Sequence, residues 1–465
     1  MVNTSQINEY IEKISAINNA YKAAYDRAKK MYIHTYGCQM NSHDSEKIAG
    51  MLADMGYEEA ESEDTADIIV YNTCCIRENA ENKIYGNLGY LKRLKAEKKD
   101  IKVVLCGCMM QQNAVIEKIR TSYRFVDVIF GTYNLYKLPE LLYTNMETGS
   151  QIIDIWQEQE EIVEDLPAVR KYPFKTGVNI MYGCDNYCTY CIVPYVRGRE
   201  RSREPEGILE EVKKLAADGV VEIMLLGQNV NSYGKNLDRN ISFADLLQMV
   251  AKVEGIKRIR FMTSHPKDLS DELIQVIKHN YNVCKSVHLP IQSGSSKILS
   301  KMNRKYTKES YLALVDKLRK EIPGIAITTD IICGFPSETD EDNDETLDVI
   351  EKVRYSGAFT FIYSKRNGTP AASMNCQIDE VTVKSRFNKL LSTLNPIIYE
   401  ISKSHIGNTY EVLGEDMSKN DPELITGRLD DNSIVHFKGN AAHIGKLTTV
   451  KITDCKTFYL IGEII

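Results

Sequence analysis

The sequence lacks an apolar run long enough to cross a bilayer. A membrane-spanning helix needs about 18 or more largely apolar residues, and no segment of this 465-residue chain approaches that length. Its first residues, MVNTSQINEYIEK, also lack the basic and then apolar order of an export signal. We therefore expect a cytoplasmic protein without a membrane partner.

The chain also lacks an excess of positive charge. Its 58 Lys and Arg residues stand against 64 Asp and Glu residues, which gives a net charge of −6. Non-specific binding to nucleic acid depends largely on Lys and Arg contacts to phosphates. This balance argues against a protein that coats nucleic acid, so any nucleic-acid site must be local.

The composition, 43% hydrophobic and 26% charged, is typical of a globular protein, with room for roughly two to four domains. Twelve cysteines are spread along the chain without an export signal, which favours reduced thiols over disulfides. Four of them stand alone in apolar or mixed sequence, and we predict that they are core or surface residues: Cys284, Cys333, Cys376 and Cys455.

The first third of the chain predicts a helix and then an α/β domain. Residues 1–30 form a polar helical extension in this prediction, with apolar positions three or four residues apart: Ile7, Ile11, Ile14, Ile17 and Tyr21. Residues 31–148 alternate apolar runs, such as ADIIVYNT and KVVLCG, with helical stretches, which predicts a parallel sheet with helices on its faces. The acidic segment at 149–173 lacks clear periodicity and is predicted to be a linker.

Strand and helix alternation restarts at residue 174. Six strands are predicted at 177–182, 222–226, 258–263, 286–290, 325–332 and 358–363. They indicate a partial or full βα barrel over 174–402, whose active site would lie at the C-terminal ends of the strands. A long helix near 383–404 leads to short alternating runs that predict a small antiparallel β-barrel at 403–465. The predicted fold class is α/β with this small β-barrel added.

The strongest motif is GCDNYCTYC, in which Cys184, Cys188 and Cys191 follow a predicted strand with C-x3-C-x2-C spacing. Three thiolates in one loop can hold a [4Fe–4S] cluster and leave its fourth iron open to another ligand. Zinc is the main competitor, but structural zinc usually needs a fourth Cys or His, and this spacing is unusual for it. The motif therefore predicts a catalytic iron–sulfur cluster.

Polar residues follow other strands of the predicted barrel, where active-site residues gather. The candidates for contact with a cofactor or substrate are Gln228, Ser264, His265, Gln292, Ser293 and Asp330. Each of them could instead cap the next helix. Gly294 and Gly334 could let the backbone approach a cofactor closely, although single glycines are weak indicators. His288 precedes a proline in an apolar strand and is predicted to be a core histidine.

Three further cysteines follow successive strands of the N-terminal domain: Cys38 in TYGCQMN, Cys74 in NTCC and Cys108 in LCGC. The carboxyl ends of parallel strands meet at one edge of a sheet, so these residues can share one site. A second cluster with an open iron is the predicted occupant, and three buried thiols are the alternative. Cys106 lies within an apolar strand, which favours Cys108 as the ligand. The choice between Cys74 and Cys75 depends mainly on resemblance.

The three-cysteine loop and the strand order after it resemble the radical S-adenosylmethionine (SAM) superfamily of βα barrels. In that superfamily the methionine part of SAM chelates the open iron, and one electron from the cluster cleaves SAM to give a 5′-deoxyadenosyl radical. The resemblance implies that Tyr190, before the third cysteine, packs against the adenine of SAM. The alternative is a simple core tyrosine.

Nearly the whole chain from about residue 31 resembles the methylthiotransferase family, most closely its MiaB type. The resemblance is carried by TYGCQMNSHDSEKIAGML, NTCCIRENAENK, GCDNYCTYCIVPYVRGRERSR and GFPSETDEDNDETL, and Gln39-Met40-Asn41 indicates the branch. It implies a cluster-bearing N-terminal domain, a radical barrel and a TRAM domain. It also implies SAM-dependent methylation of a cluster-bound sulfur, followed by radical attack at carbon 2 of N6-isopentenyladenosine beside the anticodon of tRNA.

Such a reaction requires both open irons to approach one base, which must leave the anticodon loop. In VRGRERSR, four alternating arginines could hold phosphates beside Tyr195, which could stack: Arg197, Arg199, Arg201 and Arg203. The alternative is a solvated or internally paired strand, because Glu200 and Glu204 interleave. The last domain has seven Lys or Arg against nine Asp or Glu, so local groups such as Lys438 would have to contact RNA.

The sequence also allows three other functions. The same clusters could act on a ribosomal-protein aspartate or on threonylcarbamoyl-adenosine in tRNA, and a redox-sensing iron–sulfur protein would lack radical chemistry. The Gln39-Met40-Asn41 loop argues against the first rival. A monomer is expected, with tRNA, SAM, an electron donor and a sulfur source as partners. The sequence identifies neither the electron donor nor the sulfur source.

Overall fold

The computed structural model describes residues 4–75, 78–158, 162–164, 166–419 and 421–465. The chain divides into two compact units, each described by itself. The first comprises 1–171, 182–185 and 192–203, and the second comprises 172–181, 186–191 and 204–465. Residues 1–3 of the predicted N-terminal helix and residues 159–161 and 165 of the predicted linker lie outside the described residues.

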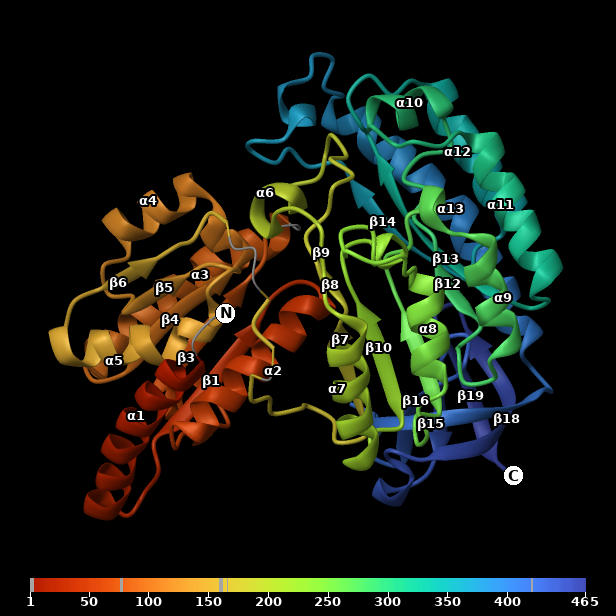
Figure 1. Cartoon of the computed structure of the whole chain (residues 1–465). Helices are drawn as coiled ribbons and strands as arrows, with labels where there is room; N and C mark the ends of the chain where they lie inside the picture. The colour runs from red at the N-terminus through yellow and green to blue at the C-terminus, as the bar shows by residue number, and fades with distance from the viewer. Residues whose placement is uncertain (1–3, 76–77, 159–161, 165, 420) are drawn as a thin grey trace. The chain divides into compact units, whose positions relative to one another are not determined.

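A parallel six-stranded sheet forms the centre of the first unit (Figure 1). Its strand order is β2-β1-β3-β4-β5-β6, and every neighbouring pair is parallel. The strands are β1 (Lys30–Thr35), β2 (Glu58–Glu59), β3 (Ile68–Thr73), β4 (Lys102–Gly107), β5 (Val128–Phe130) and β6 (Ile152–Asp154). The helices are α1 (Thr4–Tyr25), α2 (Gln39–Asp54), α3 (Glu78–Glu97), α4 (Asn113–Ser122) and α5 (Leu138–Thr148).

Both faces of this sheet are buried, as its apolar strands predict. Along β3, Ile68 and Val70 join one apolar cluster, whereas Ile69 and Tyr71 join another. Helix α1 packs through Ile14, but Ile17 is 38% exposed, so the predicted apolar stripe is narrower than expected. Strand β6 falls in the range predicted as linker; its three residues were too short a run to show periodicity.

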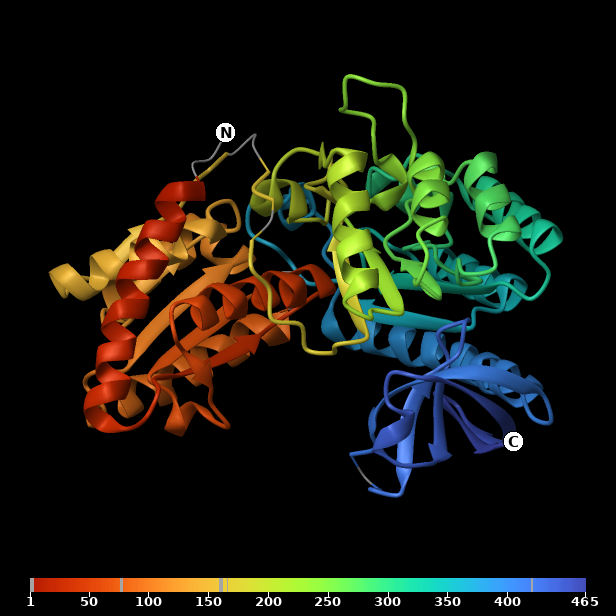
Figure 2. The ribbon, with the colours of Figure 1, turned by 60° about the horizontal axis from the view of Figure 1, so that its bottom comes forward.

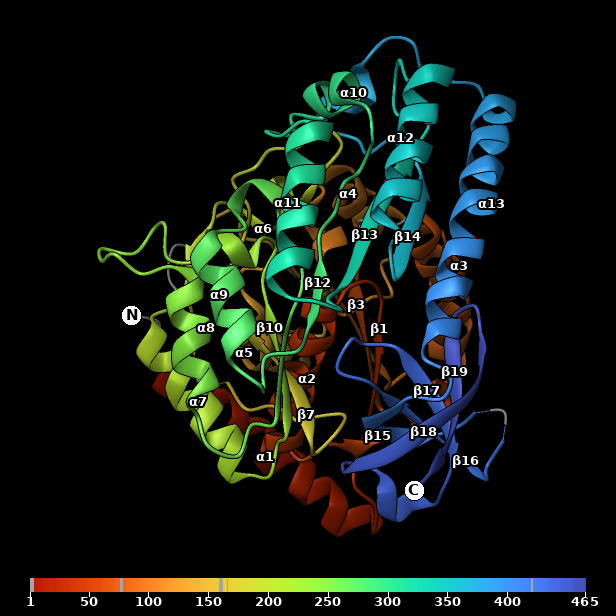
Figure 3. The same cartoon turned by 90° about the vertical axis from the view of Figure 1, so that its right-hand side faces the viewer.

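The second unit contains a partial βα barrel (Figure 3). Its six parallel strands are β7 (Lys175–Asn179), β10 (Glu222–Leu226), β11 (Arg258–Phe261), β12 (Ser286–His288), β13 (Ala326–Cys333) and β14 (Gly357–Ile362). They form two three-stranded sheets, which a parallel bridge between Ile259 and Val283 joins. Within the described chain, β7 and β14 do not pair, so the barrel is open. These strands match the predicted places, and the α/β fold class is confirmed.

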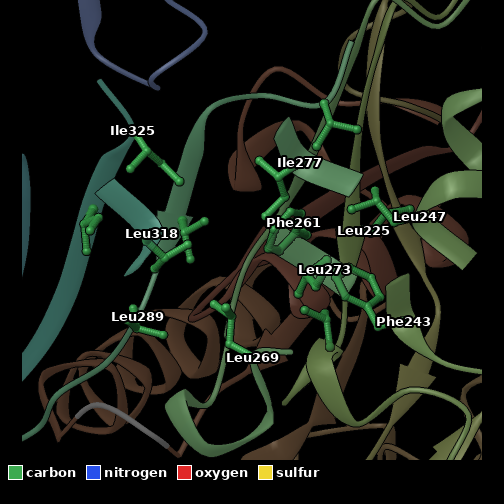
Figure 4. Close-up of a cluster of buried hydrophobic side chains, with 14 of the residues drawn as sticks. Leu225, Phe243, Leu247, Phe261, Leu269, Leu273, Ile277, Leu289, Leu318 and Ile325 are labelled. Atoms are coloured by element: carbon green, nitrogen blue, oxygen red, sulfur yellow. The ribbon is translucent and has the colours of Figure 1, made fainter. Parts of the chain in front are cut away.

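Helices cover the outer face of the barrel strands. They are α7 (Pro205–Ala217), α8 (Phe243–Ala251), α9 (Asp271–His279), α10 (Ser296–Lys301), α11 (Lys308–Glu321), α12 (Asp340–Val353) and α13 (Glu380–Ser404). Figure 4 shows part of the apolar core between strands and helices, where Leu225 and Phe261 of the strands lie near helix residues such as Leu247 and Leu273. Ile327 and Ile331 of β13 join this core, so the alternate residue Asp330 faces the opposite side.

A closed five-stranded barrel ends the second unit (Figure 2). Its order is β15-β16-β17-β19-β18, with β15 (Thr409–Met417), β16 (Leu424–Arg428), β17 (Ile434–Lys438), β18 (Leu447–Lys456) and β19 (Tyr459–Ile464). The buried Arg260 joins it to the βα barrel by donating to the carbonyl groups of Leu429 and Asp430. Among the described residues, no helix is both long and apolar enough to cross a membrane.

Candidate cluster and cofactor sites

The first cysteine set lies at the carboxyl edge of the parallel sheet, as predicted. Cys38 is the residue before α2, Cys74 follows β3, and Cys108 follows β4. Cys74 and Cys108 are buried, and Cys38 is partly buried. The strand ends thus bring three cysteines that are distant in sequence to one edge of the sheet.

The side chain of Asn41 contacts two of these cysteines. Its Oδ1 atom lies 4.0 Å from Sγ of Cys38 and 3.8 Å from Sγ of Cys108. Its Nδ2 donates to the carbonyl groups of Tyr36, at 2.8 Å, and Thr73, at 2.9 Å. The amide therefore has a fixed orientation, and its oxygen marks a point that both thiols share.

The third cysteine, Cys74, lies against Gly37, the residue before Cys38. The φ of Gly37 is +107°, and a Cβ at this position would lie 2.6 Å from Sγ of Cys74. Any larger residue would collide with Cys74 and would be strained in this conformation. The turn before Cys38 therefore packs directly on Cys74.

A buried arginine completes this site. Arg197 ends the short helix α6 (Val193–Arg197), and its side chain is 5% exposed. Its Nε donates to Sγ of Cys108 at 3.2 Å, and its Nη2 donates to Oδ1 of Asn41 at 2.7 Å and to Asp44 at 2.9 Å. Cys108 and Asp44, both potential anions, raise the pKa of Arg197, so this guanidinium is always charged.

Cys75 is buried in the same apolar cluster as Cys74 and Cys108, whereas the neighbouring Cys106 has different surroundings. Cys106 packs in the apolar cluster on the other face of the sheet from Cys108, and its Sγ lies 3.7 Å from the carbonyl oxygen of Tyr71. Burial raises the pKa of Cys108 to about 11, and Arg197 opposes the rise. Cys38 and Cys74 also act electrostatically on Cys108. This geometry favours Cys108 over Cys106 as the ligand, and Cys74 stays a prediction.

The second cysteine set lies in the loop between β8 (Met181–Tyr182) and β9 (Arg201–Ser202). Within the first unit, the N–H of Cys184 donates to the carbonyl of Gly198 at 3.1 Å. Within the second unit, the N–H of Cys191 donates to the carbonyl of Cys188 at 2.9 Å, forming a tight turn. The turn presents Cys188 and Cys191 on the same short stretch of backbone.

Arg304 is a second buried guanidinium beside a cysteine, and it was not among the predicted site residues. Its Nη1 donates to Sγ of Cys188 at 3.4 Å, its Nη2 donates to the carbonyl of Pro290 at 3.0 Å, and its Nε donates to Tyr306 at 2.8 Å. Burial of a charge is costly without partners of this kind. A charged residue in the loop after α10 gives no sequence signal of burial, because loops normally carry charges.

Unpartnered polar atoms gather in the loops after β10 and β11. Oγ of Ser264, Nε2 of His265 and both side-chain polar atoms of Asn231 are buried without a hydrogen-bond partner among the described residues. Nδ1 of His265 accepts from the N–H of Lys267, so Nε2 carries the proton of the neutral ring. Burial lowers the pKa of His265 to about 2, with help from Arg304. Buried polar groups are rarely left unpaired, so these atoms fit a polar ligand such as SAM.

The other predicted cofactor residues lie on neighbouring loops and strands. Gln292 has a φ of +68° and bridges β13 through the carbonyl of Asp330 and the N–H of Ile332. Asp330 lies 3.4 Å from Nε2 of His288. Ser293 accepts from the N–H of Ser295, and Ser295 rather than Ser293 caps α10. Gln228 is partly buried just after β10.

Two of the predicted cofactor residues, Tyr190 and Gly334, pack against other parts of the protein, and this packing alone accounts for their residue types. Tyr190 packs against an apolar cluster that includes Met302 and Phe335. At Gly334, where φ is +80°, a Cβ would lie 2.7 Å from a methyl group of Val383. The close neighbour of this glycine is thus helix α13. Three of the four lone cysteines, Cys284, Cys333 and Cys455, are buried, and Cys376 is exposed, as predicted.

The four arginines predicted to bind phosphates differ in exposure. Arg197 and Arg203 are buried in ion pairs with Asp44 and Glu164, so the structure departs from the prediction at these two positions. Glu164 pairs with Arg203 through both carboxylate oxygens. The alternation of charged residues in VRGRERSR predicts exposed side chains. It does not reveal which arginines are buried.

The remaining predicted RNA contacts are accessible to different degrees. The Arg199 side chain is 76% exposed and pairs with Asp185, and Tyr195 is 46% exposed. Arg201 is partly buried and lies over the ring of Tyr133. Lys438 is exposed at the end of β17. These positions are compatible with an RNA contact.

No group of three His, Cys, Asp or Glu side chains among the described residues is arranged to hold a single metal ion. A four-iron cluster spreads its thiolate ligands over a larger volume than one ion does. The fit of the first cysteine set to such a cluster therefore depends on the shared contacts with Asn41, Gly37 and Arg197. The fit of the loops after β10 and β11 to SAM depends on the buried polar atoms of Ser264, His265 and Asn231 that have no partner among the described residues.

Three protein families match separate parts of the chain. Residues 30–131 match the Uncharacterized protein family UPF0004, residues 178–350 match the Radical SAM superfamily, and residues 403–465 match the TRAM domain. These ranges correspond to the parallel sheet, the partial barrel and the closed β-barrel.

Curated relatives match almost the full length of the chain. A protein of Lachnoclostridium phytofermentans is 57% identical over 431 residues, which cover 93% of this chain and 94% of the relative. A protein of Alkaliphilus oremlandii is 55% identical over 459 residues, which cover 98% and 97%. Both are named tRNA-2-methylthio-N(6)-dimethylallyladenosine synthase.

The fold also resembles that of a solved radical SAM structure. TsrM from Kitasatospora setae, a radical S-adenosylmethionine methyltransferase with cobalamin and a [4Fe-4S] cluster bound, superposes with a TM-score of 0.54. The match has 16% identity and covers 74% of this chain and 77% of TsrM. At this identity the likeness extends to the fold alone.

Proposed function

Because the chain belongs to the family of tRNA-2-methylthio-N(6)-dimethylallyladenosine synthases, we propose that it adds a methylthio group to carbon 2 of N6-isopentenyladenosine beside the anticodon of tRNA. The reaction would use two [4Fe–4S] clusters and two roles of SAM, as methyl donor and as radical source. The observation that carries the proposal is the pair of three-cysteine sets, each with a buried arginine donating to one cysteine.

Cys38, Cys74 and Cys108 would hold one cluster, and Cys184, Cys188 and Cys191 would hold the other. Three ligands to each cluster leave one iron open for an exogenous ligand. When bound, the second cluster supplies the electron that cleaves SAM to the 5′-deoxyadenosyl radical, and the first supplies the site of the transferred sulfur. The protein contributes position, charge and exclusion of water.

The barrel residues would bind and orient SAM. Ser264, His265 and Asn231 offer buried polar atoms that have no partner among the described residues. Since burial keeps His265 neutral, its Nε2–H can donate a hydrogen bond but cannot supply positive charge. Arg304 supplies the buried positive charge beside Cys188, which suits the carboxylate of SAM. The other candidates for SAM contacts are Gln228, Gln292, Ser293, Asp330 and Tyr190.

Exposed groups would hold the tRNA. Tyr195 offers an exposed ring on which a base can stack, and Arg199 and Lys438 offer positive charge for phosphates. The TRAM domain adds a small β-barrel of a kind suited to RNA. With a net charge of −6, the chain would depend on such local contacts rather than on a basic surface.

The test is an anaerobic reaction of the iron- and sulfide-loaded protein with reductant, SAM and tRNA that contains N6-isopentenyladenosine. Mass spectrometry of the digested tRNA should show the 2-methylthio nucleoside, together with 5′-deoxyadenosine. Parallel reactions should offer tRNA that contains threonylcarbamoyl-adenosine and ribosomes. A methylthio product only in one of these parallel reactions would overturn the substrate assignment, and the absence of 5′-deoxyadenosine would overturn radical chemistry.

A further inference from the structure

Arg197 is placed to act on the N-terminal cysteine site rather than on RNA. Three of its N–H···acceptor contacts point inward, to Cys108, Asn41 and Asp44. Two of these acceptors, Cys108 and Asn41, also define the meeting point of the cysteine set. The guanidinium is therefore part of the wall of this site.

The segment that carries Arg197 is anchored in the core of the first unit. Ile192 and Val196 pack in the same apolar cluster as Cys74 and Cys108. The carbonyl of Val196 also accepts from the hydroxyl of Thr132 at 2.7 Å. These contacts fix the backbone just before Arg197, and the hydrogen bonds to Cys108, Asn41 and Asp44 hold its guanidinium inward.

Asp44 fixes the orientation of the guanidinium. It accepts from Nη2, and its side chain is 13% exposed. Nε is thereby left facing Cys108. A buried ion pair of this kind rarely adds stability by itself, which indicates a role beyond holding the fold together.

The charge of Arg197 matches what an iron–sulfur cluster needs at this position. A cluster held by three thiolates is anionic, and a buried anion requires a compensating charge. The reduction potential of such clusters depends on net charge and on hydrogen bonds to the sulfur atoms. A cation that donates to a ligand sulfur favours the more negative, reduced form.

We propose that Arg197 is a positioning residue of the N-terminal cluster: it holds the Cys108 thiolate in place and raises the reduction potential of the cluster. This inference rests on the proposed function, because it assumes a cluster on Cys38, Cys74 and Cys108. It assigns to Arg197 a part in cluster binding instead of phosphate binding.

The experiment uses the full chain with Cys184, Cys188 and Cys191 replaced by alanine, so that only the N-terminal cluster can form. Into this background we would introduce Arg197→Met, Arg197→Lys and, as the matched control, Arg203→Met. Arg203 is also a buried arginine of the same segment, but its partner is Glu164. The readouts are iron per chain after anaerobic loading and the midpoint potential from a redox titration followed by EPR.

Arg197→Met should either bind at least twofold less iron than the Arg203→Met control or show a more negative midpoint potential. Arg197→Lys keeps the charge but lacks the planar set of donors, so its potential should fall between those of the control and Arg197→Met. If Arg197→Met does not fold, as judged by circular dichroism, Arg197→Lys decides the question by its shift relative to the control.

The inference is overturned if Arg197→Met has the same iron content and midpoint potential as the control. Where Arg197→Met does not fold, the same result in Arg197→Lys overturns it. Either result leaves the proposed function intact. Failure of the proposed function itself would give a different result, which the background chain alone reveals. In that case the background chain with unaltered Arg197 would bind no cluster that depends on Cys38, Cys74 and Cys108.

Discussion

Nη1 of Arg304 donates to Sγ of Cys188 at 3.4 Å, and both side chains are buried. Arg197 and Cys108 stand in the same relationship in the other unit. Each cysteine set thus contains one sulfur atom that accepts a hydrogen bond from a buried arginine. Hydrogen bonds to ligand sulfur atoms tune iron–sulfur clusters, so both pairs suit a cluster site.

The first prediction concerns iron content. The fully loaded chain should bind about eight iron atoms, and replacing either three-cysteine set with alanine should leave about four. The single variants Cys106→Ala and Cys75→Ala are the controls, since neither cysteine belongs to the predicted ligand sets. Iron and sulfide analysis of anaerobically loaded protein checks the numbers. A loss of about four irons in Cys106→Ala would mean that the ligand at the end of β4 has been misassigned.

The second prediction concerns pH and His265. Burial lowers the folded-state pKa of this histidine to about 2, below its ordinary value of 6.5. The unfolded chain therefore binds a proton below pH 6.5 that the folded chain does not, and stability falls as pH decreases from 6.5 toward 2. Between pH 7 and pH 5 this group should cost about 2 kcal/mol of unfolding free energy.

His265→Gln should remove that cost, so its unfolding free energy should decrease less than that of the wild type between pH 7 and pH 5. Urea titrations of the cluster-free protein at both pH values would measure the difference. The exposed His279 provides the control variant His279→Gln. Identical pH dependence in the wild type and His265→Gln would show that His265 is accessible to protons in the folded chain.

The third prediction concerns Gly334. Alanine at this position would be strained at a φ of +80° and would collide with Val383, so we expect a loss of about 1–3 kcal/mol. Gly368→Ala is a matched control, because it has a φ of +87° but nothing within 4 Å of the added Cβ. Gly334→Ala should therefore cost more than Gly368→Ala in urea unfolding.

Adding Val383→Ala to Gly334→Ala separates the steric effect from the backbone effect. Since the smaller side chain removes the colliding methyl groups, this double variant should lose less stability than the two single variants predict together. Additive losses would indicate that the strain at Gly334 is in the backbone alone. Unchanged stability with weaker SAM binding would instead support the predicted role of Gly334 in cofactor approach.

Local patterns predicted the elements well, because short strands and helical stretches alternate along the chain with turn residues between them. The meeting of Cys38, Cys74 and Cys108 at one edge also followed from sequence, since parallel strands end together. The inward turn of Arg197 did not follow. Its orientation depends on the packing of Ile192 and Val196 in the core of the N-terminal sheet. This packing joins residues far apart in sequence, and the local sequence pattern does not predict it. Arg304 was missed for the same reason.

The fourth prediction separates the arginines of VRGRERSR by their effect on tRNA binding. Arg199 is largely exposed, so Arg199→Ala should weaken tRNA binding and reduce the slope of log affinity against log salt by about 0.7 if one phosphate contact is lost. Filter binding or anisotropy over a range of salt concentrations measures this slope. Lys214→Ala on α7, an exposed cation outside this segment, should leave the slope unchanged.

Tyr195→Ala should act differently from Arg199→Ala, because stacking on a base is not a charge effect. Loss of one stacked base costs about 1–3 kcal/mol, so affinity should fall while the salt slope stays the same. Arg197→Lys should change neither quantity, since the guanidinium of Arg197 is buried against Cys108 and Asp44. A salt slope that falls in Arg197→Lys as much as in Arg199→Ala would show that Arg197 leaves its buried position to contact phosphate.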